Sequence, residues 1–131
     1  MRIAINGMGR IGRLLFRRLI HHPEIELVAV NDIMPTDNLA YLLKYDSVYG
    51  TFENEIVIAE RSFVVNNKKV AALQTADPAK LRWKEMNIDV VIECTGKFTT
   101  ADTAGLHLKA GAGSITVNNG FSRYSINDLW F

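Results

Sequence analysis

The chain has 131 residues, of which 48% are hydrophobic and 22% are charged, the ordinary balance of a soluble globular domain with its own core. Fifteen Lys and Arg residues face fourteen Asp and Glu residues, so the charge supports neither a nucleic-acid partner nor an anionic membrane surface. No apolar run approaches the ~18 residues that a membrane-spanning helix needs.

Residues 2–32 have the pattern of one β-α-β unit. Arg2–Asn6 (RIAIN) is short and β-prone, and the nearly continuous apolar run 25–30 (IELVAV) fits a buried parallel strand. Between them, residues 13–20 (RLLFRRLI) have helical spacing. One face of this helix is expected to carry Ile11, Leu14, Leu15, Leu19 and Ile20, and the other Arg13, Arg17 and Arg18, facing solvent or a neighbouring subunit.

The middle of the chain contains a second helix and a hairpin. A helix capped by Thr36 or Asp37 is predicted to end at Lys44, and residues 45–54 are loop-like. Residues 55–73 alternate between apolar and polar side chains, and Asn66-Asn67 suits a hairpin turn because asparagine tolerates positive φ.

The last part returns to alternating strands and helices. Asp77-Pro78 opens a short turn or helix, residues 88–92 (IDVVI) form a buried strand, residues 99–112 include a helical stretch, and residues 114–118 can add a strand. This alternation predicts a doubly wound α/β domain: a mostly parallel sheet with right-handed crossovers, helices on both faces and a small hairpin insertion.

The glycine turn GMGRIG after the first strand has the G-x-G-x-x-G spacing of dinucleotide-binding domains. Gly7 permits the tight turn, Gly9 lets the backbone approach a pyrophosphate, and Gly12 lets the helix pack closely on the strand. The helix N-terminus then presents N–H groups to phosphate. A tight turn without any ligand is the alternative interpretation.

Asp32 ends the second strand, where its carboxylate can accept hydrogen bonds from the adenosine ribose and repel a 2′-phosphate. This favours NAD over NADP. The alternative is a solvated acid that begins a turn with Asn31.

The stretch IECTGKF contains Cys94, the single cysteine of the chain. Thr95, Gly96 and Phe98 follow a predicted strand and are candidates for one wall of a nucleotide site, although an ordinary strand exit would look similar. Cys94 is expected to be a small packed thiol rather than a catalytic one, because no histidine is placed by the sequence to activate it.

The remaining titratable residues give weaker signals. His21 and His22 are expected to assist a helix C-terminus rather than bind metal, and no metal-ligand cluster is apparent. His107 is expected on a helix surface. Glu93 could act as a base only with Cys94 as its partner, and that pair lacks a third member.

With these residues in view, the chain resembles the NAD-binding domain of the phosphorylating, glycolytic glyceraldehyde-3-phosphate dehydrogenases. AINGMGRIGR is similar to the family's opening AINGFGRIGR, with Met8 in place of the usual Phe. The segments VAVND, LLKYDSVYG, VNNKK, DPAKLRWKE, IDVVIECTGKFT and HLKAGA match successive family blocks. The resemblance implies a Rossmann-type fold over residues 1–118, a homotetramer with much of its interface absent from these residues, and an unmatched tail over residues 119–131.

Carried over by position, the resemblance implies that Gly7, Gly9, Arg10 and Ile11 line the pyrophosphate, that Asp32 binds ribose, and that Thr95, Gly96 and Phe98 surround the adenosine. Ala76 stands where the family often has Arg, so a backbone contact could remain there. Asn118 stands where the family has a serine near the nicotinamide. The expected cofactor is NAD, and the expected cofactor-binding residues are Asn6, Gly7, Gly9, Arg10, Ile11, Gly12, Asp32, Ala76, Thr95, Gly96, Phe98 and Asn118.

The resemblance also implies what these residues do not supply. The family's nucleophilic cysteine lies in a Ser-x-Ser-Cys-Thr-Thr-Asn block, which the 131 residues do not contain. No catalytic residue is therefore predicted, and the chain alone is expected to be inactive in aldehyde oxidation. Two alternatives stay open: a non-catalytic nucleotide-binding or interaction module, and a fragment of an erythrose-4-phosphate dehydrogenase.

The expected location is the cytoplasm. One cysteine excludes an internal disulfide, and MRIAINGMG has no apolar leader segment with a cleavage site. The expected partner is NAD, with no nucleic acid and no membrane.

Overall fold

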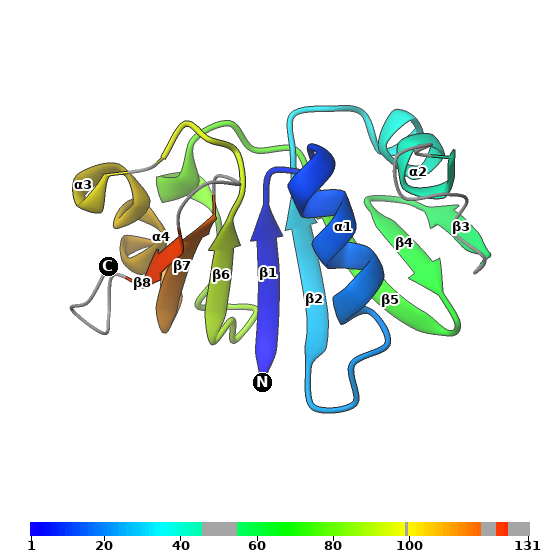
Figure 1. The fold of residues 1–131 in the computed structure, drawn as a ribbon, viewed down its shortest axis with the longest axis horizontal. Helices are drawn as coiled ribbons and strands as arrows, with labels where there is room; N and C mark the ends of the chain where they lie inside the picture. The colour runs from blue at the N-terminus through cyan, green and yellow to red at the C-terminus, as the bar shows by residue number, and fades with distance from the viewer. Residues whose placement is uncertain (46–54, 99, 119–122, 126–131) are drawn as a thin grey trace.

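The computed structural model describes residues 1–45, 55–98, 100–118 and 123–125, with side chains at 101, 118 and 123–125 excluded. These residues form an eight-stranded sheet in the order β3-β4-β5-β2-β1-β6-β7-β8 (Figure 1). The strands are β1 (Arg2–Asn6), β2 (Glu26–Asn31), β3 (Ile56–Ala59), β4 (Ser62–Val65), β5 (Lys68–Leu73), β6 (Val90–Glu93), β7 (Ser114–Asn118) and β8 (Arg123–Ser125). The helices are α1 (Arg10–Leu19), α2 (Thr36–Tyr45), the 3-10 turn η1 (Pro78–Lys80), α3 (Ala101–Ala104) and α4 (Leu106–Lys109).

The centre of the sheet is parallel, as predicted. The strand β1 pairs in parallel with β2 on one side and with β6 on the other. The strands β5 and β7 extend this parallel block, and antiparallel β3, β4 and β8 flank it. The register places Asn6 opposite both Asn31 and Glu93. Three polar residues therefore form one row across the carboxyl ends of the central strands.

Two hydrophobic cores lie on opposite faces of the sheet because successive side chains of a strand point to opposite faces. From β1, Ile3 and Ile5 enter the first core together with Phe16 of α1. Ala4 enters the second core, where Trp83 and Ile115 are fully buried. This arrangement confirms the predicted doubly wound α/β class.

The helix α1 is confirmed, but its buried face differs from the predicted one. Phe16 and Ile20 are the most buried apolar side chains of this segment, while Leu15 and Leu19 pack at the edge of the first core. Arg13 is buried rather than solvent-facing, and its Nη1 donates to the Met8 carbonyl at 2.9 Å. Arg17 donates to the Leu43 carbonyl at 2.8 Å. The predicted solvent-facing position is therefore wrong for Arg13, while Arg17 is half-buried; carbonyls near the helix accept hydrogen bonds from both side chains.

The hairpin insertion has one more strand than the sequence indicated. Asn66 and Asn67 have φ of 50° and 65° and form the predicted turn between β4 and β5. A second tight turn at Arg61, with φ of 53°, adds the edge strand β3. The predicted helix α2 is present over Thr36–Tyr45, so Thr36 is its first residue rather than its cap, and the helix ends one residue later than predicted. The predicted loop over residues 45–54 lies outside the described residues from residue 46 onward.

The segment between β5 and β7 contains short helical pieces rather than one long helix. The Asp77 side chain accepts a hydrogen bond from the Ala79 N–H at 3.0 Å and caps η1. The predicted helical stretch over 99–112 divides into α3 and α4 at Gly105. His107 on α4 is completely buried, so its predicted surface position was wrong.

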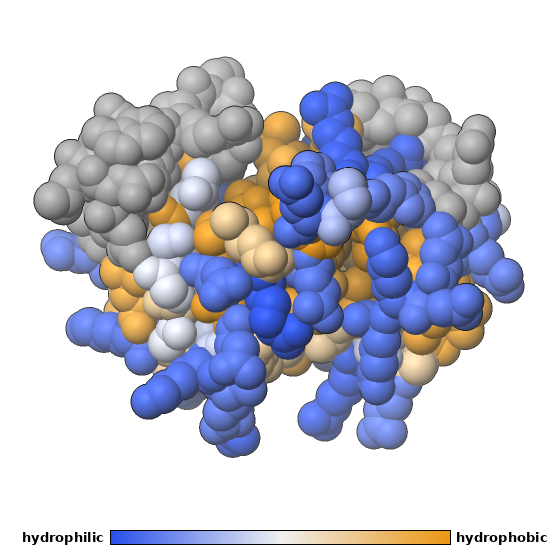
Figure 2. Space-filling view, turned by 90° about the horizontal axis from the view of Figure 1, so that it is seen from below, coloured by the Kyte–Doolittle hydropathy of each residue, from blue (hydrophilic) through white to orange (hydrophobic). Residues whose placement is uncertain are grey.

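The carboxyl-terminal residues that are described form β8, which pairs antiparallel with β7. Residues 119–122 and 126–131 of the predicted tail lie outside the described residues, and the division at residue 118 stays a prediction. Figure 2 shows the end of the molecule where the parallel strands begin, with hydrophilic side chains projecting around exposed apolar atoms. In the described part of the chain, no helix has the length and apolar character to cross a membrane.

Candidate functional site

A cleft of about 320 Å³ lies at the carboxyl ends of β1, β2 and β6. In open α/β sheets, ligands bind at these strand ends. Seven of the predicted site residues line the cleft: Asn6, Gly7, Gly9, Asp32, Ala76, Thr95 and Phe98. Arg10 and Gly96 are next to lining residues in the chain without lining the cleft themselves, and Ile11 and Gly12 lie further along α1 and do not line it. The side chain of Asn118 lies outside the described residues.

Two glycines of the turn are required by the chain's own packing. Gly7 has φ of 95°, and a Cβ added there would lie 2.7 Å from the Thr95 backbone N. A Cβ added at Gly12 would collide with the Gly7 carbonyl oxygen. The Gly7 N–H donates to the Asn31 carbonyl at 2.8 Å. These contacts hold α1, β1 and the Thr95 segment close together at the cleft.

Gly9 differs from both of these glycines. Its φ of −71° is open to any residue, and an added Cβ would meet no atom within 4 Å. Nothing in the described chain therefore requires glycine at this position. Gly9 lines the cleft and directly precedes α1, whose N-terminus has no side-chain cap. A phosphate group fits this arrangement, since it needs close backbone approach and uncapped N–H groups.

The Asp32 carboxylate is held by two backbone N–H groups. Its Oδ2 accepts from the Met8 N–H at 2.7 Å and its Oδ1 from the Met34 N–H at 2.9 Å. The first bond ties the end of β2 to the glycine turn. Each carboxylate oxygen has further lone-pair capacity, so both can still accept hydrogen bonds from ribose hydroxyls in the cleft.

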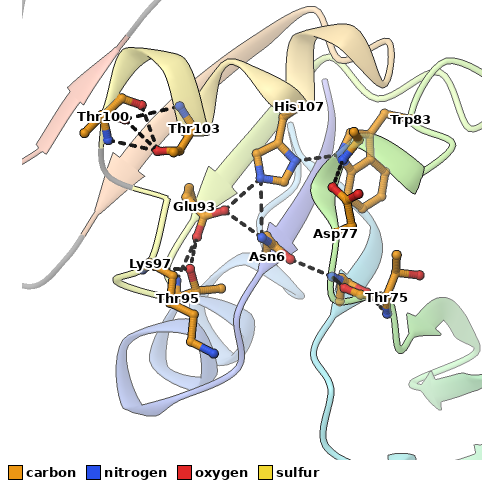
Figure 3. Close-up of polar contacts among 12 residues, drawn as sticks. Asn6, Thr75, Asp77, Trp83, Glu93, Thr95, Lys97, Thr100, Thr103 and His107 are labelled. Atoms are coloured by element: carbon orange, nitrogen blue, oxygen red, sulfur yellow. Dashed lines mark hydrogen bonds and ion pairs between the residues drawn. The ribbon is translucent and has the colours of Figure 1, made fainter.

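Five further lining residues were not predicted as site residues: Asn31, Ile33, Thr75, Cys94 and Lys97. Glu93, which does not line the cleft, is a buried neighbour of the site whose contacts sequence reasoning also missed. It is 1% exposed, and its carboxylate accepts from Asn6 Nδ2 at 2.6 Å, the Thr95 N–H at 2.8 Å and Thr95 Oγ1 at 2.6 Å (Figure 3). His107 Nε2 lies 2.8 Å from its Oε1. A signal was available, because Glu93 and the buried Val91 share one face of β6 by the two-residue period. The partner on α4 had no such signal.

The polar row continues from Glu93 across the sheet. Asn31 Nδ2 donates to Asn6 Oδ1 at 2.7 Å and to the Thr75 carbonyl at 2.8 Å. Asn31 Oδ1 accepts from the Thr75 N–H at 2.9 Å. The network therefore connects the ends of β6, β1 and β2 to the segment after β5, and its members Asn6, Asn31, Thr75 and Thr95 line the cleft.

Cys94 lies in a different environment from the histidine on α4. It is half-buried against the first core, and its backbone N–H donates to the Asn6 carbonyl at 2.7 Å. His107 bonds Glu93 and Trp83, and Trp83 belongs to the second core on the other face of the sheet. Cys94 also lines the cleft, and its packing against the first core agrees with the prediction of a packed thiol.

Metal ligation finds no support in the described residues, where no group of three or more His, Cys, Asp or Glu side chains is arranged to hold an ion. His21 and His22 are exposed, and His22 Nδ1 accepts from the Glu24 N–H at 3.2 Å. The His22 side chain thus forms a local turn contact beyond α1.

A parallel sheet, a glycine turn that leads into α1, and an acid at the end of β2 define a Rossmann-type dinucleotide-binding domain. Residues 1–101 match the family described as "Glyceraldehyde 3-phosphate dehydrogenase, NAD binding domain". The chain belongs to this family of NAD-binding domains, which confirms both the predicted family and the predicted cofactor.

Named relatives agree with this assignment. The chain is 48% identical over 118 residues to the glyceraldehyde-3-phosphate dehydrogenase of Mycoplasma pneumoniae, covering 90% of this chain and 35% of the relative. It is 50% identical over 117 residues to the enzyme of that name from Clostridium pasteurianum, and 43% identical over 117 residues to glyceraldehyde-3-phosphate dehydrogenase A of Escherichia coli; each match covers 89% of this chain and 35% of the relative. The chain thus spans about a third of the length of these relatives.

Proposed function

We propose that the cleft at the carboxyl ends of β1, β2 and β6 is the NAD site, and that the domain serves glyceraldehyde-3-phosphate oxidation in glycolysis. The observation that carries the proposal is that one cleft contains both Gly9, which the chain's own packing does not require, and Asp32, whose carboxylate is anchored at the strand end. The first suits a pyrophosphate and the second a ribose diol.

The glycine turn holds the phosphates in this proposal. Gly7 and Gly9 bring backbone to the pyrophosphate, and Arg10 and Ile11 contribute the first N–H groups of α1. Gly12 acts indirectly, since its missing Cβ allows α1 to approach the Gly7 carbonyl. The positive end of the helix dipole adds to the attraction for negative charge.

Asp32 and the two walls of the cleft hold the adenosine half of NAD in this proposal. Asp32 accepts from the ribose hydroxyls and disfavours a 2′-phosphate by charge repulsion. Thr95, Gly96 and Phe98 form one wall, and the exposed Ala76 supplies backbone on the other. Asn118 at the end of β7 is proposed for the nicotinamide side on the resemblance alone.

NAD, when bound, supplies the nicotinamide ring that accepts a hydride. The residues of this chain bind and orient that cofactor, and none is proposed as nucleophile or base. We expect the chain by itself to bind NAD and to show no glyceraldehyde-3-phosphate oxidation, because the 131 residues lack the family's Ser-x-Ser-Cys-Thr-Thr-Asn block.

Calorimetric titration with NAD and NADP tests the proposal. NAD should bind at one site per chain, and Asp32→Ala should weaken NAD binding by about tenfold while reducing discrimination against NADP, since hydrogen bonds to a charged group contribute ~1.5–3 kcal/mol. Glu60→Ala, which removes an exposed acid of the β3–β4 turn, is the control and should bind both cofactors like the wild type. An unchanged NAD/NADP ratio in Asp32→Ala would show that the ribose assignment is wrong.

A reducing cytoplasm is the proposed location, because the single half-buried cysteine suits a reducing compartment. The resemblance implies a homotetramer for the family. Light scattering on the purified chain would measure how much of that association these residues support.

A further inference from the structure

The hydrogen bond between Trp83 and His107 determines which ring nitrogen of His107 carries the proton. The Trp83 indole Nε1–H can only donate, and it lies 3.0 Å from His107 Nδ1 (Figure 3). His107 Nδ1 must therefore be an acceptor, which leaves the hydrogen on Nε2. Nε2–H points to Glu93 Oε1 at 2.8 Å and donates to it. Both rings are completely buried.

The backbone of Thr75 fixes the opposite end of the network in the same way. Its N–H can only donate and its carbonyl can only accept, so they orient the Asn31 amide unambiguously. Asn31 Nδ2 then donates to Asn6 Oδ1, and Asn6 must present its Nδ2 to Glu93. The donor that this end of the network directs at Glu93 is therefore the Asn6 Nδ2 group.

Glu93 is the acceptor on which these hydrogen bonds converge. Its Oε1 accepts from Asn6 and His107, and its Oε2 accepts from the N–H and the hydroxyl of Thr95. Thr95 Oγ1 in turn accepts from the Lys97 N–H at 3.1 Å, across Gly96 with φ of 73°. The Glu93 carboxylate thus shapes the turn of residues 95–97, which borders the cleft.

We propose that Glu93 is a positioning residue of the NAD site, held by a tautomer-locked His107. Glu93 does not line the cleft itself. It acts through Thr95 and Asn6, which line the cleft. Trp83 acts through His107, whose tautomer it fixes. The inference rests on the proposed NAD site, because positioning has meaning only if the cleft binds the cofactor.

The network explains why an acid is required here and an amide would fail. Glutamine has nearly the same shape but offers one oxygen and one NH2 group. If the NH2 group of glutamine replaced Oε2, it would face the Thr95 backbone N–H, which is also a donor. If it replaced Oε1, it would face the donors of Asn6 and His107. Neither Asn6 nor His107 can reverse without breaking its bond to Asn31 or Trp83. A buried donor left without an acceptor is unfavourable, so the turn of residues 95–97 should shift.

The test is NAD binding by Glu93→Gln, with folding checked by circular dichroism. We expect NAD affinity to fall by about tenfold, the effect of losing one or two hydrogen bonds to a charged group. Glu85→Gln is the matched control, because Glu85 is an exposed acid whose ion pair with Arg82 is 3.7 Å long. It should bind NAD like the wild type. A folded Glu93→Gln chain with wild-type NAD affinity would overturn the proposal.

Trp83→Phe provides a second test that leaves the cleft residues unchanged. It removes the donor to His107 Nδ1, so the Nδ1 signal in ¹⁵N NMR of the His107 ring should shift relative to that of the wild type. NAD affinity should fall several-fold at the same time. A shifted Nδ1 signal with unchanged NAD affinity would overturn the positioning role, even if Glu93→Gln failed to fold.

The two proposals fail in different ways. If the wild-type chain binds no NAD, the proposed site itself is wrong. If the wild type binds NAD and Asp32→Ala weakens that binding, while Glu93→Gln and Trp83→Phe do not, only the positioning role is wrong. A wild-type His107 that carries its proton on Nδ1 would contradict the tautomer assignment directly.

Discussion

Two neighbouring rows of residues across the same three strands have opposite characters. Val30, Ile5 and Ile92 are opposite one another on β2, β1 and β6, and all three belong to the first core or pack against it. One residue further along, a second row consists of Asn31, Asn6 and Glu93. The change from hydrophobic core to polar network thus takes a single residue step. The first row contributes stability, and the second shapes the binding cleft.

The largest expected effect comes from the apolar row. Ile5 is completely buried in the first core, and Ile5→Ala should lower the free energy of unfolding by about 2–5 kcal/mol because it leaves a cavity as well as losing apolar contacts. Urea denaturation measures this loss. NAD affinity of the folded fraction should stay close to wild type. A strong loss of affinity at full folding would show that the two rows are not separable.

The glycine turn offers a test in which NAD affinity should change and stability should not. Gly9→Ala should leave the free energy of unfolding within about 0.5 kcal/mol of wild type, because its Cβ meets no atom within 4 Å. It should weaken NAD binding about tenfold by blocking backbone approach to the pyrophosphate.

Gly12→Ala is the matched change in the same turn. Its Cβ would collide with the Gly7 carbonyl, so thermal unfolding should show a clear loss of stability. Equal effects of the two substitutions on stability and on NAD affinity would contradict the separation between a packing glycine and a ligand-facing glycine.

The smallest expected effect is that of Cys94→Ser. The side chain is half-buried at the edge of the first core, so the free energy of unfolding should fall by less than about 1 kcal/mol. NAD affinity should change little, because serine is similar in size to the cysteine that lines the cleft here. An aldehyde oxidation by the wild-type chain that disappears in Cys94→Ser would contradict both the packed-thiol interpretation and the absence of catalysis in this chain.

Local patterns were sufficient to predict the parts of the structure that local chemistry determines. The spacing of Gly7, Gly9 and Gly12 predicted the turn and α1, and the two asparagines at 66 and 67 predicted the β4–β5 hairpin. Asp32 was placed at the end of β2 because an apolar strand must end where polar residues begin. The NAD-binding family was predicted from several segments that match the family in order and spacing, the glycine turn among them.

The predictions that failed depended on contacts that each helix makes with residues outside itself. His107 looked like a surface residue because α4 is a short helix with a mixed pattern, but Trp83 and Glu93, 24 and 14 positions away in the chain, supply its partners. Arg13 looked solvent-facing because it shares a helix face with Arg17 and Arg18, yet the Met8 carbonyl accepts its Nη1–H beneath the turn. None of these three partners could be inferred from spacing along a single element.

The central claim is that NAD binds at the carboxyl ends of the parallel strands, beside the polar row. A titration of the ¹⁵N-labelled chain with NAD, followed by backbone amide NMR, tests it most directly. We predict saturable shifts at Gly7, Gly9, Asp32, Thr95 and Gly96, and little change at the opposite end of the sheet around Pro23 and Lys69. No shifts at millimolar NAD, or shifts centred on that opposite end, would contradict the claim.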